Sequence, residues 1–223
     1  MHLRTLGLAA FMLTLAAMPA SAKAKSYQTI LVGLDLSRSN PLTVDARYAA
    51  KVAQRVGPMI KPLKPHDEVK IRTFGSYDPR EQPLHIDQVI SARNLPDDVA
   101  EVVQGIIAGV PTLVERGTLK TQSSTHILAF LDNMAQVADC KERDTTIVLA
   151  SDGIEESDEA RLSSVRGTLP KPQGKPFEGC KSLQILGLGV GQKNPALTIH
   201  LREEWAAWAK AAGFEEFEGL NDW

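Results

Sequence analysis

Three runs of consecutive apolar residues predict three buried strands in this chain. The runs lie within Tyr27–Leu36, Thr145–Ala150 and Leu183–Val190. Apolar runs without polar alternation are typical of strands that are covered on both faces, as in a parallel sheet.

Two further stretches, Glu68–Phe74 and Leu84–Ile90, alternate apolar and polar residues, which is the period of a β-strand. Only a short link with the turn signal Asp78-Pro79 separates them. A link this short predicts antiparallel neighbours. Phe214–Leu220 is expected to add a short edge strand.

Helical spacing of apolar residues predicts four helices between the strands. They are Val44–Val56, a helix that opens at Leu95-Pro96-Asp97-Asp98, Thr125–Ala138 and Pro195–Ala212. Gly57-Pro58 is expected to end the first helix, and Pro111 to end or kink the second. Gly213 is expected to cap the C-terminus of the last.

The inner face of the second helix is expected to comprise Val99, Val102, Val103, Ile106 and Ile107. In the last helix, Trp205 and Trp208 are expected to pack in the core, with Leu197 and Leu201. Strands that alternate with helices predict an α/β fold: a doubly wound, mostly parallel central sheet with one antiparallel edge strand and helices on both faces.

The N-terminus has the features of a secretory signal peptide. Arg4 precedes the apolar run Leu6–Ala17, and Ala20-Ser21-Ala22 matches a cleavage site. The run is shorter than the roughly 20 residues that span a bilayer. We therefore expect a signal peptide at 1–22, a single domain at 23–223 and a bacterial periplasmic or secreted location; an uncleaved anchor or a core helix are the alternatives.

Composition excludes several classes of partner. The chain has 223 residues, 43% hydrophobic and 23% charged, with a net charge of −2. Without a basic excess, no nucleic-acid partner is expected, and without a second long apolar segment, no membrane span is expected after signal cleavage. The even count of cysteines, Cys140 and Cys180, favours a disulfide in an exported protein, and two buried thiols are the alternative.

Oxygen-bearing side chains follow two of the buried strands. Asp35, Ser37 and Ser39 come after the first strand, Asp152 after Thr145–Ala150, and Thr125 at the expected start of a helix. In a doubly wound sheet, ligands bind outside the C-terminal ends of the strands. Hydroxyls and carboxylates without His or Cys suit a hard cation: Mg²⁺, or Mn²⁺ or Ca²⁺.

Each residue also has a plainer interpretation. Asp35 and Asp152 are typical turn residues, and Ser37, Ser39 and Thr125 are typical helix caps. The acidic stretch Glu155–Glu159 is expected to be a solvated face.

In combination, these residues resemble the metal-ion-dependent adhesion site (MIDAS) of the von Willebrand factor type A (VWA) domain. The matching motifs are Asp35-Leu36-Ser37-Arg38-Ser39, Ser123-Ser124-Thr125-His126-Ile127 with Leu131 after it, and Ser151-Asp152-Gly153. The resemblance runs from Tyr27 to the C-terminus. It departs from the family pattern at Ser123-Ser124, where a glycine pair is usual, and at Arg38 and Asn40, which puts the affinity for a cation in question.

The resemblance implies a Rossmann-like VWA fold and a protein-binding function. Ser37, Ser39 and Thr125 would reach the ion directly, Asp35 and Asp152 would act mainly through water, and an acidic side chain of a protein partner would fill the open position. The family's strand order, 3-2-1-4-5-6, also implies that Cys140 and Cys180 lie at the edge opposite the metal, close enough for a disulfide.

The resemblance therefore implies a non-enzymatic, metal-dependent binding or scaffold domain. The alternative is a metal-dependent hydrolase or phosphotransferase that uses Asp35. A dehalogenase-type phosphatase would need a second aspartate at position 37, which is serine, and the chain has no Gly-x-Ser-x-Gly elbow or phosphate loop. A small-ligand binder is a third alternative, although such proteins usually close a second lobe on the ligand.

Overall fold

The computed structural model describes residues 27–76 and 84–223. The expected signal peptide and the Asp78-Pro79 turn lie outside the described residues. Within them, the strands of one sheet are β1 (Tyr27–Asp35), β2 (Glu68–Phe74), β3 (His85–Val89), β4 (Arg143–Ala150), β5 (Ser182–Leu186) and β6 (Glu216–Leu220).

The strand order is β3-β2-β1-β4-β5-β6. Every neighbouring pair is parallel except β2 and β3, which are antiparallel. The predicted fold class is confirmed, including the antiparallel edge strand. The order reverses direction at β1 and β4, which places the C-terminal ends of these two strands at the switch point where doubly wound folds bind ligands.

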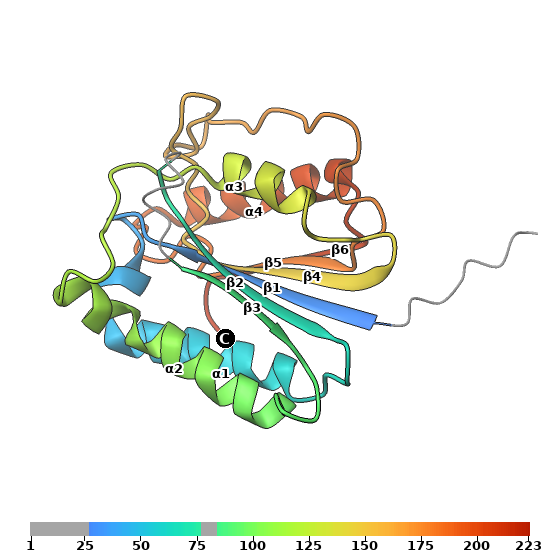
Figure 1. Ribbon diagram of the computed structural model, residues 1–223. Coiled ribbons are helices and arrows are strands. Elements are labelled where there is room, and N and C mark those ends of the chain that lie inside the picture. The colour runs from blue at the N-terminus through green and yellow to red at the C-terminus, as the bar shows by residue number, and fades with distance from the viewer. Residues whose placement is uncertain (1–26, 77–83) are drawn as a thin grey trace, which may run out of the picture.

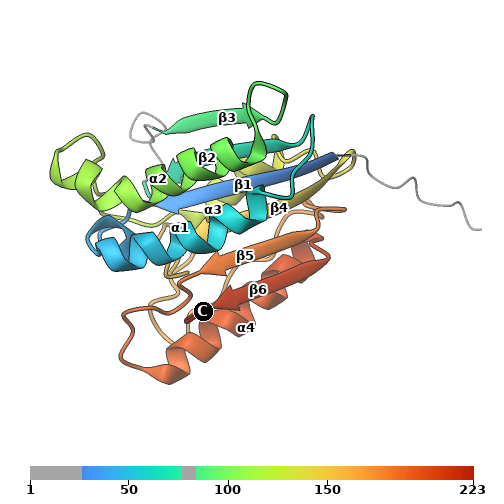
Figure 2. The same cartoon turned by 90° about the horizontal axis from the view of Figure 1, so that it is seen from below.

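Two pairs of helices cover the two faces of the sheet (Figure 1). The helices are α1 (Ala46–Ile60), α2 (Pro96–Glu115), α3 (Ile127–Ala135) and α4 (Pro195–Ala212), with a short 3-10 helix η1 (Pro41–Thr43) after β1. Helices α1 and α2 lie on one face, and α3 and α4 lie on the other. Figure 2 shows β3 and β6 at opposite edges of the sheet. No helix among the described residues combines the length and apolar character needed to cross a bilayer.

The apolar run of β1 divides its side chains between two cores. Ile30, Val32 and Leu34 pack in the core beneath α1 and α2. Leu31 packs in the core beneath α3 and α4. A strand covered on both faces needs apolar residues at consecutive positions, which explains why the run lacks polar alternation.

Gly33 lets α3 approach β1 closely. A Cβ atom at Gly33 would lie 2.8 Å from Leu149 Cδ2 and from Phe130 Cε1. We expect Gly33→Ala to lower the free energy of unfolding by about 1–3 kcal/mol, because the core must shift to accept the methyl group. Gly105→Ala, in α2 with nothing within 4 Å of the added atom, is the control and is expected to stabilise. Chemical denaturation of both variants measures the difference, and equal effects would contradict the packing argument.

Pro58 does not end its helix as predicted, and Pro111, which was predicted to end or kink its helix, does not end it. Helix α1 continues past Pro58 to Ile60, and α2 continues past Pro111 to Glu115. Ile60 is completely buried, four residues after buried Val56, so burial of one more turn offsets the hydrogen bond lost at the proline. Tertiary packing thus overrides the local stop signal.

Other expected boundaries and faces also need correction. The side chain of Val102 is 57% exposed rather than internal, because the buried stripe of α2 follows Val99, Val103, Ile107 and Val110. Strand β5 ends at Leu186, since Gly187 adopts a φ of 111° that an extended strand does not use. By contrast, α4 has its predicted bounds, and Trp205 and Trp208 are buried as expected.

Cys140 and Cys180 form a disulfide, as predicted. Cys140 precedes β4 and Cys180 precedes β5, and these neighbouring parallel strands begin at the same edge of the sheet. The bond therefore lies at the edge opposite the C-terminal ends of β1 and β4. It closes the segment that contains Asp152 and the proline-rich stretch before Cys180.

Candidate metal centre

Two aspartates lie together at the C-terminal ends of β1 and β4. The register pairs Leu34 with Ala150, so Asp35 and Asp152 leave the sheet side by side. Both carboxylates are completely buried. A buried carboxylate is costly unless it is hydrogen-bonded or paired with a cation, so the contacts of each one define what the site can hold.

Both oxygens of Asp35 accept hydrogen bonds. Oδ1 accepts from the backbone N–H of Ser37 at 2.8 Å, and Oδ2 accepts from the hydroxyl of Ser151 at 2.7 Å. These bonds fix the carboxylate at the strand tip. The first bond closes a turn from Asp35 to Ser37, and the second joins the end of β1 to the residue that follows β4.

Asn40 ties the two strand ends to each other. Its buried side-chain amide donates to the carbonyl of Asp35 at 3.0 Å and to the carbonyl of Ala150 at 2.8 Å. Sequence reasoning did not assign a role to Asn40 or Ser151. The available signal was their position: each lies within or beside a motif, and each has a short polar side chain able to satisfy backbone groups at a strand end.

The other candidate oxygen donors at these strand ends belong to Ser37, Ser39 and Asp152. The hydroxyl oxygens of Ser37 and Ser39 lie 3.2 Å apart. Asp152 Oδ1 accepts from the backbone N–H of Ile154 at 3.0 Å. Asp152 Oδ2 is buried and has no hydrogen-bond partner among the described residues. The Ser39 hydroxyl lies near the Asp152 carboxylate. The cluster therefore offers a carboxylate oxygen and two hydroxyls, which are oxygen donors suited to a hard cation.

Thr125 reaches the same edge through backbone pairing. Its N–H donates to the carbonyl of Glu156 at 3.3 Å, and the N–H of Glu156 donates back at 2.9 Å. Three residues earlier, Gln122 accepts from the N–H of Arg38 at 3.0 Å. The segment with Thr125 therefore lies between the loop after β1 and the loop after β4. Helix α3 begins at Ile127 with His126 as its N-cap, so Thr125 precedes the cap and does not occupy it.

Glu155 corrects the expectation of a solvated acidic face. Glu156, Asp158 and Glu159 are exposed, but Glu155 is completely buried. Its Oε2 accepts from the backbone N–H groups of Ile127 and Leu128, at the start of α3. Sequence reasoning missed this contact because Glu155 and the helix are distant in the chain.

The pKa values of both aspartates are raised above their ordinary range. Burial, followed by the charge of Asp152, raises the pKa of Asp35 to about 7, against the hydrogen bonds from Ser37 and Ser151. Burial also raises the pKa of Asp152, against the hydrogen bond from Ile154 and the nearby Ser39 hydroxyl. A divalent cation near the two carboxylates would favour their charged forms and lower both pKa values. Among the described residues, no group of three or more His, Cys, Asp or Glu side chains is arranged to hold a metal, so an ion here would depend on the hydroxyls.

The raised pKa of Asp35 predicts how the stability of the metal-free protein changes with pH. Folded Asp35 keeps its proton up to about pH 7, whereas the unfolded residue loses it near its ordinary value of 3.8. Because the folded state binds the extra proton between these values, the free energy of unfolding is expected to fall as pH rises from about 4 to 7, by up to about 1.4 kcal/mol per pH unit.

Urea denaturation in a chelator across this pH range measures the slope. Asp35→Asn is expected to reduce it, because asparagine does not titrate. A stability that rises with pH over this window, with a slope unchanged in Asp35→Asn, would contradict the prediction.

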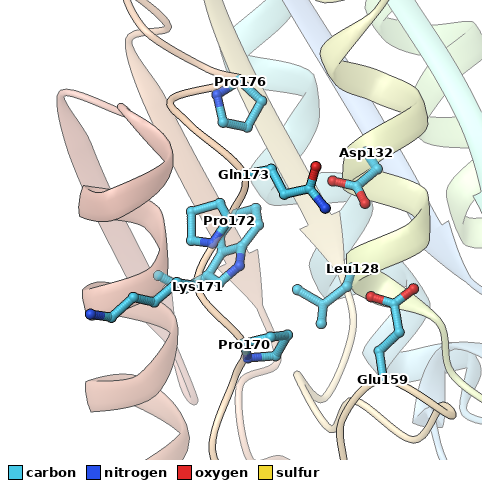
Figure 3. Close-up of a pocket in the computed structure, with 9 residues that line it drawn as sticks. Leu128, Asp132, Glu159, Pro170, Lys171, Pro172, Gln173 and Pro176 are labelled. Carbon is cyan, nitrogen blue, oxygen red and sulfur yellow. The ribbon is translucent and has the colours of Figure 1, made fainter.

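A pocket of about 310 Å³ lies elsewhere, between α3 and the proline-rich stretch before Cys180 (Figure 3). Its lining includes Leu128, Asp132, Pro172 and Trp208. None of the five predicted site residues lines it. The pocket and the candidate metal centre are therefore separate features.

No family model matches the chain, and no curated protein matches it. Among solved structures, the chain is similar to BatB from Bacteroides thetaiotaomicron, described as a conserved hypothetical protein, with 13% identity, a TM-score of 0.46 and coverage of 88% of this chain and 91% of that one. It is similar to the SpRpn10 VWA domain, with 14% identity, a TM-score of 0.45 and coverage of 86% and 87%. It is also similar to the ArnB paralog VWA2 from Sulfolobus acidocaldarius, with 14% identity, a TM-score of 0.42 and coverage of 89% of this chain and 43% of VWA2, less than half of that protein. The α/β architecture and its strand order are observed in the chain itself.

Proposed function

We propose that this chain is a non-enzymatic, metal-dependent protein-binding domain of the bacterial periplasm or envelope. A divalent cation, Mg²⁺ or else Mn²⁺ or Ca²⁺, would bind at the C-terminal edge of the sheet, and a carboxylate of a protein partner would complete its coordination. The observation that carries the proposal is the buried Oδ2 of Asp152, which has no hydrogen-bond partner among the described residues. The Ser39 hydroxyl lies near this carboxylate, and the Ser37 hydroxyl lies 3.2 Å from that of Ser39.

The donor set fits the ion and the role. Ser37, Ser39 and Thr125 would contribute neutral oxygens, and Asp35 and Asp152 would contribute charge mainly at longer range. With few anionic ligands bound directly, the ion would keep a strong attraction for an incoming carboxylate. The export expected from residues 1–22 and the disulfide, which persists in oxidising compartments, both favour a location outside the cytoplasm.

The contacts of Asp35 argue against the hydrolase alternative. A carboxylate nucleophile must present a free oxygen to its substrate. Both oxygens of Asp35 accept hydrogen bonds, and its side chain is completely buried. Asp35 is better placed to support an ion than to attack a substrate.

Calorimetry with Mg²⁺, Mn²⁺ and Ca²⁺ tests whether the chain binds a divalent cation. Capture of envelope proteins on the immobilised chain, in Mg²⁺ or in chelator, tests whether it binds a protein partner through that cation. We expect cation binding and a partner that is released by the chelator. Equal capture in both buffers would contradict metal dependence. Phosphatase or esterase turnover that disappears in Asp35→Ala would instead support the enzymatic alternative.

A further inference from the structure

Glu155 is a buried carboxylate with no assigned place among the five candidate ligands. Its Oε2 accepts from the backbone N–H of Ile127 at 2.7 Å and of Leu128 at 3.1 Å. Its Oε1 is buried and has no hydrogen-bond partner among the described residues. Burying a carboxylate is unfavourable, so this arrangement implies a role that a surface glutamate would not fulfil.

The first turn of α3 depends on this carboxylate. The N-terminal N–H groups of a helix have no partner within the helix, and a side chain at the N-cap usually satisfies them. The side chain of His126, the N-cap of α3, does not do so. Glu155 takes over that role from another segment, with the helix dipole favouring its charge. Burial raises the pKa of Glu155 to about 7, and the Ser157 hydroxyl and the N–H groups of Leu128 and Ile127 oppose the rise.

The segment that contains Glu155 also contacts Thr125 through its backbone. Glu156, the next residue, exchanges two backbone hydrogen bonds with Thr125, at 3.3 and 2.9 Å. The segment begins at Asp152, three residues before Glu155. The segment 152–156 therefore begins with the candidate ligand Asp152. Near its other end, Glu155 binds the start of α3 and Glu156 pairs with Thr125.

We propose that Glu155 is a positioning residue of the metal centre. By accepting from Ile127 and Leu128, it holds the start of α3, and with it Thr125, against the segment that carries Asp152. This inference rests on the proposed function, because the exact place of Thr125 affects ion binding only if an ion is bound. The contrasting role is simple stabilisation of α3, without effect on the ion.

Two conservative variants distinguish the effect of the length of the Glu155 side chain from the effect of its charge. Glu155→Asp keeps the charge but is one methylene too short to reach both N–H groups, whereas Glu155→Gln keeps the reach and a carbonyl acceptor but loses the charge. We expect Glu155→Asp to weaken Mn²⁺ binding by about 10-fold or more and Glu155→Gln to stay within about threefold of the unmodified protein, as measured by calorimetry.

Asp132→Gly is the matched control for helix stability. Asp132 lies on the exposed side of α3, so glycine there weakens the helix while leaving the contacts of Glu155 and Thr125 in place. Its Mn²⁺ affinity is expected to be unchanged, although its resistance to urea falls. If Asp132→Gly loses as much affinity as Glu155→Asp, Glu155 acts only through helix stability and the inference is wrong.

The remaining outcomes are also decisive. Mn²⁺ affinity that is unchanged in Glu155→Asp, or lost equally in Glu155→Gln, overturns the positioning role while leaving the proposed function intact. If the unmodified protein binds no Mg²⁺, Mn²⁺ or Ca²⁺, the proposed function itself fails, and this inference with it. Should Glu155→Asp not fold, amide exchange of the unmodified protein provides the test: exchange at Ile127 and Leu128 is expected to slow when Mg²⁺ is added, and no change would overturn the inference.

Discussion

Asp152→Asn is expected to weaken Mg²⁺ or Mn²⁺ binding by more than about 100-fold. A carboxylate about 5 Å from a divalent cation contributes about 6–7 kcal/mol at an effective dielectric constant of about 20, and half of that already exceeds a factor of 100 in affinity. Asparagine keeps the size of the side chain and an oxygen that can accept from Ile154, so the loop after β4 keeps its hydrogen bond.

Asp158→Asn is the control, because Asp158 is an exposed residue of the same acidic stretch and the change in net charge is identical. Its cation affinity should match that of the unmodified protein in calorimetry at moderate ionic strength, where distant surface charges are screened. Without metal, Asp152→Asn is expected to be at least as stable as the unmodified protein, since it removes a buried charge next to Asp35. Undiminished cation binding by Asp152→Asn would show that any ion lies elsewhere.

Removal of the disulfide is expected to have the largest effect on stability. The double variant Cys140→Ala, Cys180→Ala opens a loop with a sequence separation of 40, which corresponds to about 4 kcal/mol of lost stability if the bond acts by restricting the unfolded chain. For a domain of this size, the loss lowers the melting temperature by about 8–16 °C.

Thermal unfolding of the double variant, compared with the chemically reduced protein, tests this value. The two should agree, because both lack the same bond. Ser163→Ala, an exposed substitution within the closed loop, is expected to change little. A double variant as stable as the oxidised protein would show that the surrounding contacts already restrict this loop.

Local signals explain which parts of the fold were predictable. Helix α4 has its predicted bounds because Pro195 begins it and Gly213, with a φ of 100°, ends it. The bounds of β2 are also as predicted, because its alternating pattern is interrupted on both sides. The predicted end of α1 at Gly57-Pro58 was wrong, since the sequence pattern alone does not show that Ile60 packs in the core.

The candidate site divides in the same way. The sequence by itself determined the residue types of the motifs, their placement after apolar strands and the presence of two cysteines able to pair. Only the tertiary structure decided that Asn40 joins two strand ends and that Glu155 caps a helix 28 residues away in sequence. It also decided that one oxygen of Asp152 has no hydrogen-bond partner in the described part of the chain. The physical reason is that periodicity reports which faces are apolar, whereas the partner and the burial of a carboxylate depend on which distant segments pack around it.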